Sequence, residues 1–516
     1  MTTVSATAIV QVNPASSQKA FYVDPTYKGG TELGSESAPW KSLLDTDSDY
    51  PSKWNSIRSA LLANDVIVYF SARQADSDIS EQLVPPKGAA LVVNRGCRAS
   101  TARCTSGPDI TGAHRLTLDG MSMYNRDDAT PHWEEYAGTT KFKVNCVNTC
   151  GGMSLGWGDD NQRDYITIRG FEVTGPGSRI RWGGSYSYLE YMWVHDVTAI
   201  GATVQFNQAV GENGHGCPVF DRDHDITIRN NVIERGVGEG IYFAGNYLQV
   251  KYGGCPSYGN THSDILVEGN SITDTAINGG EGDGLDLKAG LMNVTVRKNV
   301  VSKTHGGGTC IVSEGVFPPA ETNYLIDGNR CTDVTGWSVV ALIAQNKTVI
   351  RNNVLTGALN KPGVYITVQT DGVYPNHQVS IYNNTLYNTA GIGIDHATDV
   401  VLRNNLLLGN SSAINGRALT NYNSDYNLFA PAGSRLREGD HSIVHASAND
   451  VVINAARADF HLRSASPAKD RGLDLSIPAN LSAGSTTFNS DIDRVLRPQG
   501  SSWDIGAYAF PGHGSR

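Results

Sequence analysis

The chain has 516 residues, with 41 lysines and arginines against 51 aspartates and glutamates, which gives a formal net charge of −10. This acidic balance argues against nucleic acid as a partner, because phosphate backbones are bound by basic surfaces. The 56 glycines and the charged fraction of only 18% are typical of a chain rich in strands and turns. No stretch of about 20 apolar residues is present, so the sequence predicts no helix that spans a membrane.

Residues 1–19 are polar and lack both a basic start and a strong apolar stretch, so we expect them to be disordered or removed by processing. Strand-like segments begin at Phe21 (FYVDP) and Ala63 (ANDVIVYF), on either side of the segment APWKSL from Ala38. Residues 20–152 are therefore predicted to form an N-terminal cap and the first coils of the repeat that follows.

An asparagine recurs downstream in one apolar frame, as in ITIRNNVI, ILVEGNSI and VTVRKNVV. A short alternating apolar run precedes each copy and an apolar pair follows it, which predicts a strand, a tight turn and a second strand. One such unit cannot bury its apolar side alone, whereas stacked units share a continuous core. Asn suits the turn because it tolerates left-handed backbone geometry and because its amide can bond to the Asn of a neighbouring coil. The recurring positions are Asn231, Asn270, Asn299, Asn329, Asn353, Asn384 and Asn405.

This repeat predicts an all-β protein, a right-handed parallel β-helix of roughly ten coils, because parallel crossovers are right-handed. We assign residues 153–420 to the main β-helix with its groove. Residues 421–516 are assigned to C-terminal coils and a cap, all within one structural domain. A β-sandwich is the alternative fold, but its strands lie in hairpins, and the paired turn residues of hairpins do not recur here.

Eight cysteines fall into four couples that are close in sequence. An even number in a loop-rich chain indicates an oxidising compartment, and the spacings are not those of zinc sites. We therefore expect a secreted or periplasmic protein, while the disulfide connectivity stays open. The couples are Cys97 with Cys104, Cys146 with Cys150, Cys217 with Cys255, and Cys310 with Cys331.

One strand of each coil carries polar side chains between inward apolar ones, since strand side chains alternate between two faces. Aligning these strands predicts two adjacent outward columns that line a groove for an extended polysaccharide. The first column is Arg181, Gln205, Tyr242 and Asp286, and the second is Asn207, Ala244, Lys288 and Ser313.

Asp286 and Lys288 are two residues apart and follow the loop GGEGDG, which adds Glu281 and Asp283. Charge in the middle of a sheet beside two more carboxylates is costly, so this segment predicts a reaction centre. A lysine crowded among strands can lose its proton near neutral pH, which would make Lys288 a general base. Asp286 opposes that loss unless it binds a metal ion. The plainer interpretation is a solvated or salt-bridged surface lysine.

The segment GDGLDLKAG resembles a coil of polysaccharide lyase family nine, the pectate-lyase-type β-helix enzymes in which a lysine four positions after GDG is the Brønsted base. The resemblance implies that Lys288 removes the C5 proton of a uronic acid unit, so that β-elimination leaves an unsaturated sugar. It also implies an acidic polysaccharide as the substrate. The calcium-binding aspartates of that family are not retained, because the corresponding coil reads VGEGIYF and keeps only Glu239.

Elimination requires the charge of the uronate carboxylate to be neutralised, as for any enolate-like transition state. We expect Arg181, His305 or a bound calcium ion to do this. The predicted calcium ligands are Glu239, Asp283 and Asp286. The predicted substrate contacts are Gln205, Asn207, Tyr242 and His305.

Two other functions fit the same residues. Asp286 and Glu314, on neighbouring coils, would lie about 5.5 Å apart, the separation of a retaining glycosidase pair. One would be the nucleophile and the other the acid and base, in a loose resemblance to β-helix glycoside hydrolases. The third function is that of a non-catalytic carbohydrate-binding solenoid, which would bind sugar and release no product. In each case we expect a monomer.

Overall fold

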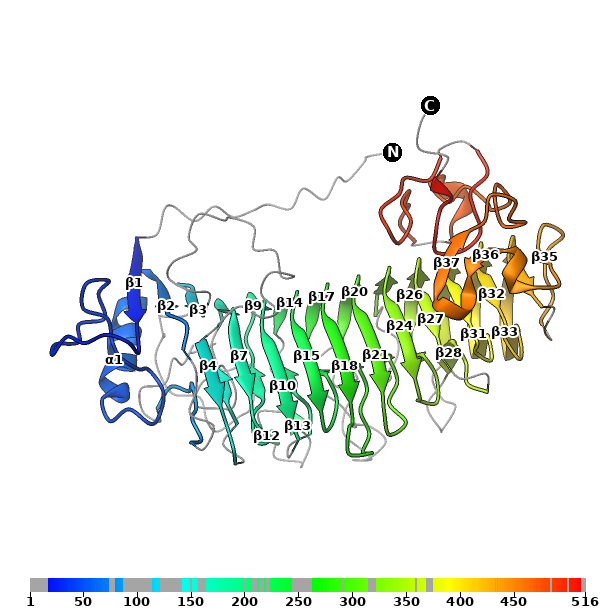
Figure 1. The fold of residues 1–516 in the computed structure, drawn as a ribbon. Helices are drawn as coiled ribbons and strands as arrows, with labels where there is room; N and C mark the ends of the chain where they lie inside the picture. Colours follow the sequence, from blue (N-terminus) through cyan, green and yellow to red (C-terminus); the bar gives the residue numbers. More distant parts are fainter. Residues whose placement is uncertain are drawn as a thin grey trace, which may run out of the picture.

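The computed structural model of the chain describes residues 17–73, 79–86, 114–120, 142–148, 151–155, 164–198, 201–206, 211–212, 218–219, 223–243, 262–288, 291–313, 322–357, 360–367, 375–431, 433, 435–482, 485–498 and 501–511. Nearly all regular structure in these ranges is parallel β-strand, wound into one elongated coil (Figure 1). The fold is therefore a parallel β-helix, as the asparagine repeat predicts, while the number of coils stays a prediction.

Each coil contributes a strand to three faces. The first face, which follows the asparagine turn, is a twelve-stranded sheet of β4 (Phe142–Asn145), β7 (Phe171–Thr174), β10 (Trp193–Val197), β15 (Val232–Gly236), β18 (Ser271–Thr275), β21 (Val300–Thr304), β24 (Arg330–Val334), β27 (Val354–Thr356), β30 (Thr385–Tyr387), β32 (Leu406–Leu408), β34 (Leu428–Ala430) and β35 (Ile443–Val444).

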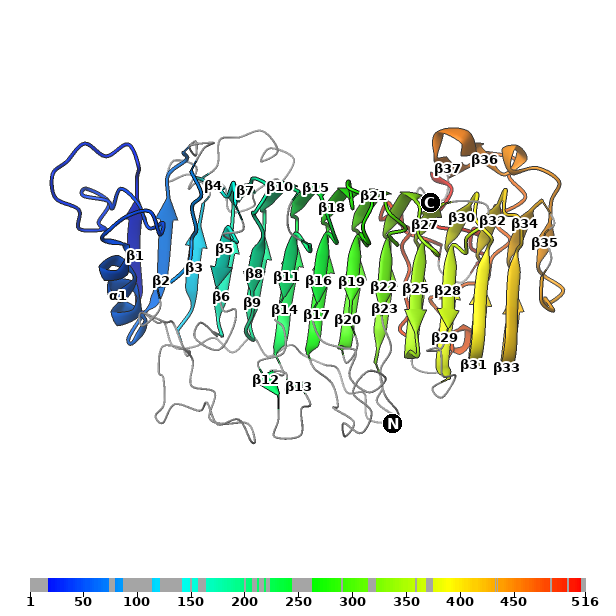
Figure 2. The same ribbon diagram turned by 90° about the horizontal axis from the view of Figure 1, so that it is seen from below.

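The middle face carries the predicted groove and is seen from outside in Figure 2. Its strands are β5 (Met153–Leu155), β8 (Ile180–Trp182), β11 (Val204–Phe206), β16 (Ile241–Phe243), β19 (Leu285–Leu287), β22 (Ile311–Ser313), β25 (Val340–Ile343) and β28 (Val364–Thr367).

The third face leads back to the next asparagine turn. Its strands are β1 (Gln18–Val23), β2 (Asp65–Phe70), β3 (Leu116–Asp119), β6 (Ile166–Arg169), β9 (Ser187–Glu190), β14 (His224–Arg229), β17 (Ser263–Glu268), β20 (Met292–Arg297), β23 (Tyr324–Asp327), β26 (Asn346–Arg351) and β29 (Asn376–Tyr382). The long strands β31 (Ile392–Arg403) and β33 (Ile414–Asp425) run through both the middle and the third face, and so join them into one 21-stranded sheet.

The coil is right-handed. In Figure 1, with the N-terminal end on the left, the first-face strands run downward, and Figure 2 shows the middle-face strands then running away from the first face. The third face returns upward while the chain advances to the right. The predicted handedness is thus confirmed.

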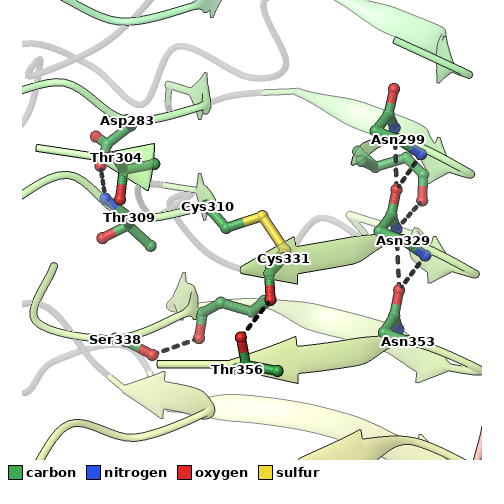
Figure 3. The surroundings of a disulfide bond; sticks show 12 residues. Asp283, Asn299, Thr304, Thr309, Cys310, Asn329, Cys331, Ser338, Asn353 and Thr356 are labelled. Atoms are coloured by element: carbon green, nitrogen blue, oxygen red, sulfur yellow. Dashed lines mark hydrogen bonds between the residues drawn. A yellow bond between two sulfur atoms is a disulfide. The ribbon is translucent and has the colours of Figure 1, made fainter. Parts of the chain in front are cut away.

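The recurring asparagines form a continuous hydrogen-bonded ladder along one edge of the coil. In each step Nδ2 donates to Oδ1 of the next Asn, at 2.8 to 3.0 Å, and the backbone N–H donates to the same oxygen. Figure 3 shows the part of the ladder through Asn299, Asn329 and Asn353. The ladder includes all seven predicted positions and continues to Asn427, which follows Tyr426 instead of an Asn, Gly or Lys.

The left-handed backbone geometry belongs to the residue before each ladder Asn. The angle φ is 55° at Asn230, 56° at Lys298 and 54° at Asn352, whereas the ladder asparagines do not have positive φ. The predicted hydrogen bonding between the Asn amides of neighbouring coils is therefore confirmed, whereas the predicted left-handed backbone geometry of these Asn residues is wrong. Asn is required here for its two-sided hydrogen bonding in a buried position, which no other small side chain provides.

Helix α1 (Tyr50–Leu61) covers the N-terminal end of the coil (Figure 1). Its residues Trp54, Ile57 and Leu61 are fully buried, and β1 pairs in parallel with β2 directly behind it. The outer edge of β1 is paired in part with the segment before the helix, because the N–H of Trp40 donates to Tyr22 O at 2.9 Å and the N–H of Asp24 donates to Trp40 O at 2.7 Å. The helix and this segment together cover the first strand.

The C-terminal segment packs along the side of the coil instead of across its open end (Figure 1). Asn383 Nδ2 donates to the carbonyls of Asp504 and Gly506, both at 3.1 Å. The end itself is covered by the turn at Leu436, which packs against the core. The predicted boundary at residue 420 falls inside β33, and the coil continues beyond it, as the assignment of C-terminal coils to residues 421–516 expects. The small elements outside the coil are β12 (Gly211–Glu212), β13 (Pro218–Val219), β36 (Val452–Asn454), β37 (Asp459–Leu462), and the 3-10 helices η2 (Ala448–Asp450), η3 (Ala455–Arg457) and η4 (Pro478–Asn480).

One predicted cysteine couple, Cys310 and Cys331, is joined by a disulfide with the Cα atoms 6.0 Å apart (Figure 3). Cys310 precedes β22 and Cys331 lies in β24, so the bond crosses the core from the middle face to the first face. Cys146 is also disulfide-bonded, and the five other cysteines lie outside the described residues. Within the described ranges no helix is long and apolar enough to cross a membrane.

Candidate functional site

The first predicted column exists on the middle face. Arg181 pairs with Gln205, Gln205 with Tyr242, and Tyr242 with Asp286, in register across β8, β11, β16 and β19. The residues on either side of each are apolar and fully buried, so these four side chains point out of the coil. Counting from the asparagine turns therefore placed them correctly.

The second column is only partly as predicted. Lys288 belongs to it, but Ser313 pairs with Leu287 and is fully buried inside the coil. The prediction for Ser313 was wrong because the register places Val312, one residue earlier, opposite Asp286. The other predicted residues Asn207, Ala244 and Glu314 lie outside the described residues, so their roles stay predictions.

Lys288 and Asp286 form a buried ion pair. The Lys288 Nζ lies 2.8 Å from Asp286 Oδ2, and the two side chains are only 4% and 1% exposed. The ammonium also lies 5.6 Å from the ring centre of Tyr242, within range of a cation–π interaction. Burial of each charge alone would be unfavourable, and their attraction at this distance offsets that cost. The pair therefore holds one proton between two groups that are shielded from solvent.

Asp283 is an acid that titrates near neutral pH. Burial raises the pKa of its carboxyl group to about 7, and the charge of Glu281 adds to the rise. The backbone N–H of Thr309, which donates to Asp283 Oδ1 at 2.6 Å (Figure 3), and the charge of Lys288 both oppose it. Near neutral pH a substantial share of Asp283 is thus the neutral carboxylic acid, which can donate a proton.

Glu239 lies on the preceding coil, just before β16. Burial raises the pKa of its carboxyl group, while the charge of Lys288 lowers it. Its backbone carbonyl accepts a hydrogen bond from the N–H of Thr203 at 2.8 Å, which anchors this turn to the neighbouring coil. Glu239 and Asp283 are therefore both within electrostatic range of the same lysine.

These carboxylates do not fit the predicted calcium site. Asp286 is paired with the Lys288 ammonium, and Asp283 is partly protonated at neutral pH. A hard divalent cation requires ionised oxygen ligands that converge. Among the residues described, no group of three His, Cys, Asp or Glu side chains is placed to hold a metal ion.

Two predicted charge-neutralising residues lie away from the pair. Arg181 is three strands from Asp286 along the column, which corresponds to about 14 Å at the spacing of neighbouring strands. His305 is half-exposed in the turn after β21, with Nε2 3.3 Å from Asp274 Oδ1. Gln205 is buried within the column.

Sequence reasoning missed a second group of side chains on the middle face, around Tyr365. Its hydroxyl donates to Asp395 Oδ2 at 2.8 Å. The segments GVYITVQ from Gly363 and GIGIDHA from Gly391 alternate like the other strands of this face, and their register places Tyr365 opposite Gly393. The signal was thus available in the alternation of these two strands.

No protein-family model and no curated protein matches the chain. Solved structures match at low identity. The catalytic unit of a thermostable GH87 alpha-1,3-glucanase from Streptomyces thermodiastaticus is 11% identical over 78% of this chain and 66% of its own length, with a TM-score of 0.42. A GH136 lacto-N-biosidase from Eubacterium ramulus is 11% identical over 78% of this chain and 67% of its own, with a TM-score of 0.38.

A family 28 exopolygalacturonase from Yersinia enterocolitica is 12% identical, with a TM-score of 0.30, over 74% of this chain and 60% of its own length. This chain therefore spans about two thirds or less of the length of these three proteins. At these identities and TM-scores the matches support no assignment of activity to this chain.

Proposed function

We propose that this protein cleaves a uronic-acid-containing polysaccharide by β-elimination, with the Lys288 and Asp286 pair as its acid and base. The observation that carries the proposal is the buried ion pair, which points outward from the middle of a strand column. A structural ion pair has no need of this position, because the apolar core of the coil is complete without it.

The pair can supply a neutral amine without exchanging a proton with water. Shielding from solvent disfavours both charges, so transfer of the Lys288 proton to Asp286 becomes less costly. The Lys288 amine then takes the C5 proton, the C5–H electrons form the C4–C5 double bond, and the C4–O4 bond breaks with its electrons on O4. The Asp286 carboxylic acid protonates O4. The pair is thereby restored to ammonium and carboxylate.

Tyr242, next to Asp286 in the column, would pack against the sugar ring. Gln205, Asn207, His305 and Arg181 would bind other units of the polymer, and Glu314 would face the same groove. The disulfides favour a secreted or periplasmic location.

The test uses Lys288→Arg with polygalacturonate and alginate as substrates. The guanidinium keeps a positive charge beside Asp286 but does not give up a proton. We expect the formation of unsaturated product, followed by ultraviolet absorbance, to fall by at least about 100-fold. The thermal midpoint should change little. An active Lys288→Arg variant would refute the role of Lys288 as the base, and a wild-type protein that binds these polymers without forming product would be a non-catalytic solenoid.

A second function, glycoside hydrolysis, is favoured by Asp283. A carboxylic acid with a pKa of about 7 is suited to act as a general acid near neutral pH. Asp283 would protonate the leaving oxygen, and Asp286 would act as nucleophile or base. Under this alternative the products are saturated reducing sugars, Asp283→Asn is inactive, and Lys288→Arg retains activity.

A further inference from the structure

Tyr365 lies flat on the outer surface of the middle face. Its neighbours in β28, Val364 and Ile366, are fully buried, so the Tyr365 side chain points outward. The residue opposite it in β31 is Gly393, and a Cβ atom there would lie 2.8 Å from Tyr365 Cδ2. The ring therefore extends over the backbone of the neighbouring strand, and only glycine leaves room for it.

The Trp337 ring lies beside the Tyr365 ring and nearly perpendicular to it. The two ring centres are 5.7 Å apart and the planes are inclined by 85°. Trp337 is 39% exposed, which is unusual for a tryptophan that is not part of a binding surface. A flat aromatic floor with a perpendicular aromatic wall offers a sugar ring two apolar faces to contact.

A charged group lies at the edge of this floor. Asp395 Oδ2 accepts the Tyr365 hydroxyl and lies 3.3 Å from the Arg417 guanidinium. Arg417 is 70% exposed, and its planar group has more N–H donors than this contact uses. Asp395 thus fixes one side of the guanidinium and leaves the other side toward solvent. That is the geometry with which Arg binds a carboxylate through two parallel hydrogen bonds.

We propose that Trp337, Tyr365 and Arg417 form a remote subsite for one uronate unit of an acidic polysaccharide, held in place by Asp395 and Gly393. The subsite is on the same face as Asp286, three strands further along the column through Val312 and Ala341, or about 14 Å. The proposal rests on the proposed function in so far as it takes a uronate polymer as substrate. The polymer lies along the strand column, with its sugar on the aromatic floor and its carboxylate on Arg417.

Binding is measured independently of catalysis, by the retardation of Lys288→Arg protein in native gels that contain polygalacturonate. Arg417→Ala and Trp337→Ala on this background should each weaken binding about tenfold or more. Arg457→Ala, at an exposed arginine of η3, is the matched control, because it changes the net charge equally and should leave retardation unchanged. Gels that contain dextran, a neutral polysaccharide without carboxylates, test whether binding requires the carboxylate of the sugar.

The expected result is retardation by polygalacturonate and not by dextran, lost in the Arg417→Ala and Trp337→Ala variants alone. If polygalacturonate retards the two variants as strongly as the Arg457→Ala control, the proposal of a subsite is wrong. If dextran retards the protein as strongly as polygalacturonate does, the subsite does not recognise the carboxylate. In otherwise wild-type protein, Arg417→Ala should raise KM for the polymer about tenfold with kcat unchanged, and should leave KM for a disaccharide or trisaccharide unchanged. If no unsaturated product forms at all, the proposed function fails, while gel retardation still decides the subsite.

Discussion

The Lys288 ammonium lies 2.8 Å from the Asp286 carboxylate on a single strand, at positions two residues apart, and both side chains are almost fully shielded from solvent. Period-two alternation puts the two side chains on the same side of the strand. The carboxylate favours the protonated lysine, whereas burial disfavours both charges, and these opposing effects keep the proton transferable within the pair. Stability and chemistry at this site are therefore coupled.

We predict that replacing one member of the Lys288 and Asp286 pair lowers the free energy of unfolding more than replacing both members. Lys288→Met leaves the buried Asp286 carboxylate without its partner, which should lower the free energy of unfolding by about 3–5 kcal/mol. The double variant Lys288→Met, Asp286→Leu should recover most of this loss, because no buried charge remains. Thermal melting of the wild type, both single variants and the double variant measures the coupling. Additive losses in the double variant would show that the two groups do not interact.

Asp283 makes a distinct pH dependence testable. Because its pKa is raised to about 7 in the folded protein, its contribution to stability is complete below the unfolded pKa of about 3.9 and is lost as the pH rises through about 7. Asp283→Asn keeps an acceptor for the Thr309 N–H but cannot ionise. Near pH 4 the variant and the wild type should have the same melting temperature. Near pH 8 the variant should melt at a higher temperature, because its free energy of unfolding is larger by up to about 4 kcal/mol. Asp440→Asn, at an exposed position, is the control and should show no such divergence. Parallel melting curves for wild type and Asp283→Asn at both pH values would contradict this account.

The sequence was sufficient for the parts of the structure that repeat. The ladder from Asn231 to Asn405 could be predicted because each copy sits in the same apolar frame, and that frame also set the register that placed Asp286 beside Tyr242. Asn427 escaped notice because its flanking residues depart from the frame. The prediction for Ser313 was wrong because its strand was aligned one residue out of register, and a shift of one residue exchanges the inward and outward sides of a strand.

Contacts between segments that do not repeat were beyond the sequence. The hydrogen bond from the Thr309 N–H to Asp283 depends on how two glycine-rich turns stack, and no periodicity encodes it. The packing of Asn383 against Asp504 joins positions 121 residues apart, which a pattern of local periods cannot reveal. Whether Lys288 pairs with Asp286 or faces solvent also depends on burial from other parts of the chain.

The disulfide across the core should resist reduction until the protein unfolds. Cys310 and Cys331 are fully buried, so a reductant cannot reach the sulfur atoms in the native state. We expect dithiothreitol followed by alkylation to leave both residues unlabelled in native protein and to label both in denaturant, as judged by peptide mass. The paired variant Cys310→Ala, Cys331→Ala should be less stable by about 2–5 kcal/mol. Labelling of these two residues in native protein would mean that the core opens locally without global unfolding.

A surface pair on the first face predicts a small acid-dependent loss. Hydrogen bonds from Arg235 lower the pKa of Asp196 to about 2, and burial opposes them only in part. Its contribution to stability is therefore present above the unfolded pKa of about 3.9 and disappears as the pH falls toward 2. Because Asp196 is half-exposed, Asp196→Asn should cost only about 0.5–1 kcal/mol at neutral pH and nothing near pH 2. Urea unfolding at the two pH values checks this, and an equal cost at both would point to lost packing rather than lost charge.

The asparagine ladder predicts that one amide supports three coils. Asn329 Oδ1 accepts from the backbone N–H and the Nδ2 of Asn299, while its own Nδ2 donates to Val296 O and Asn353 Oδ1 at 2.9 and 3.0 Å. Asn329→Ala leaves several buried groups without partners, at about 1–3 kcal/mol each, so we expect a loss of at least about 3 kcal/mol. Asn415→Ala, at an exposed asparagine of β33, should cost less than about 0.5 kcal/mol.

Asn329→Asp retains the acceptor but buries a charge, so its loss of unfolding free energy should shrink as the pH is lowered and the carboxyl is protonated. Amide hydrogen exchange of Asn299, whose N–H loses its acceptor, should accelerate in Asn329→Ala and stay slow in Asn415→Ala. Equal stability of the two alanine variants would mean that the stacked strands, and not the ladder, hold the turns in register.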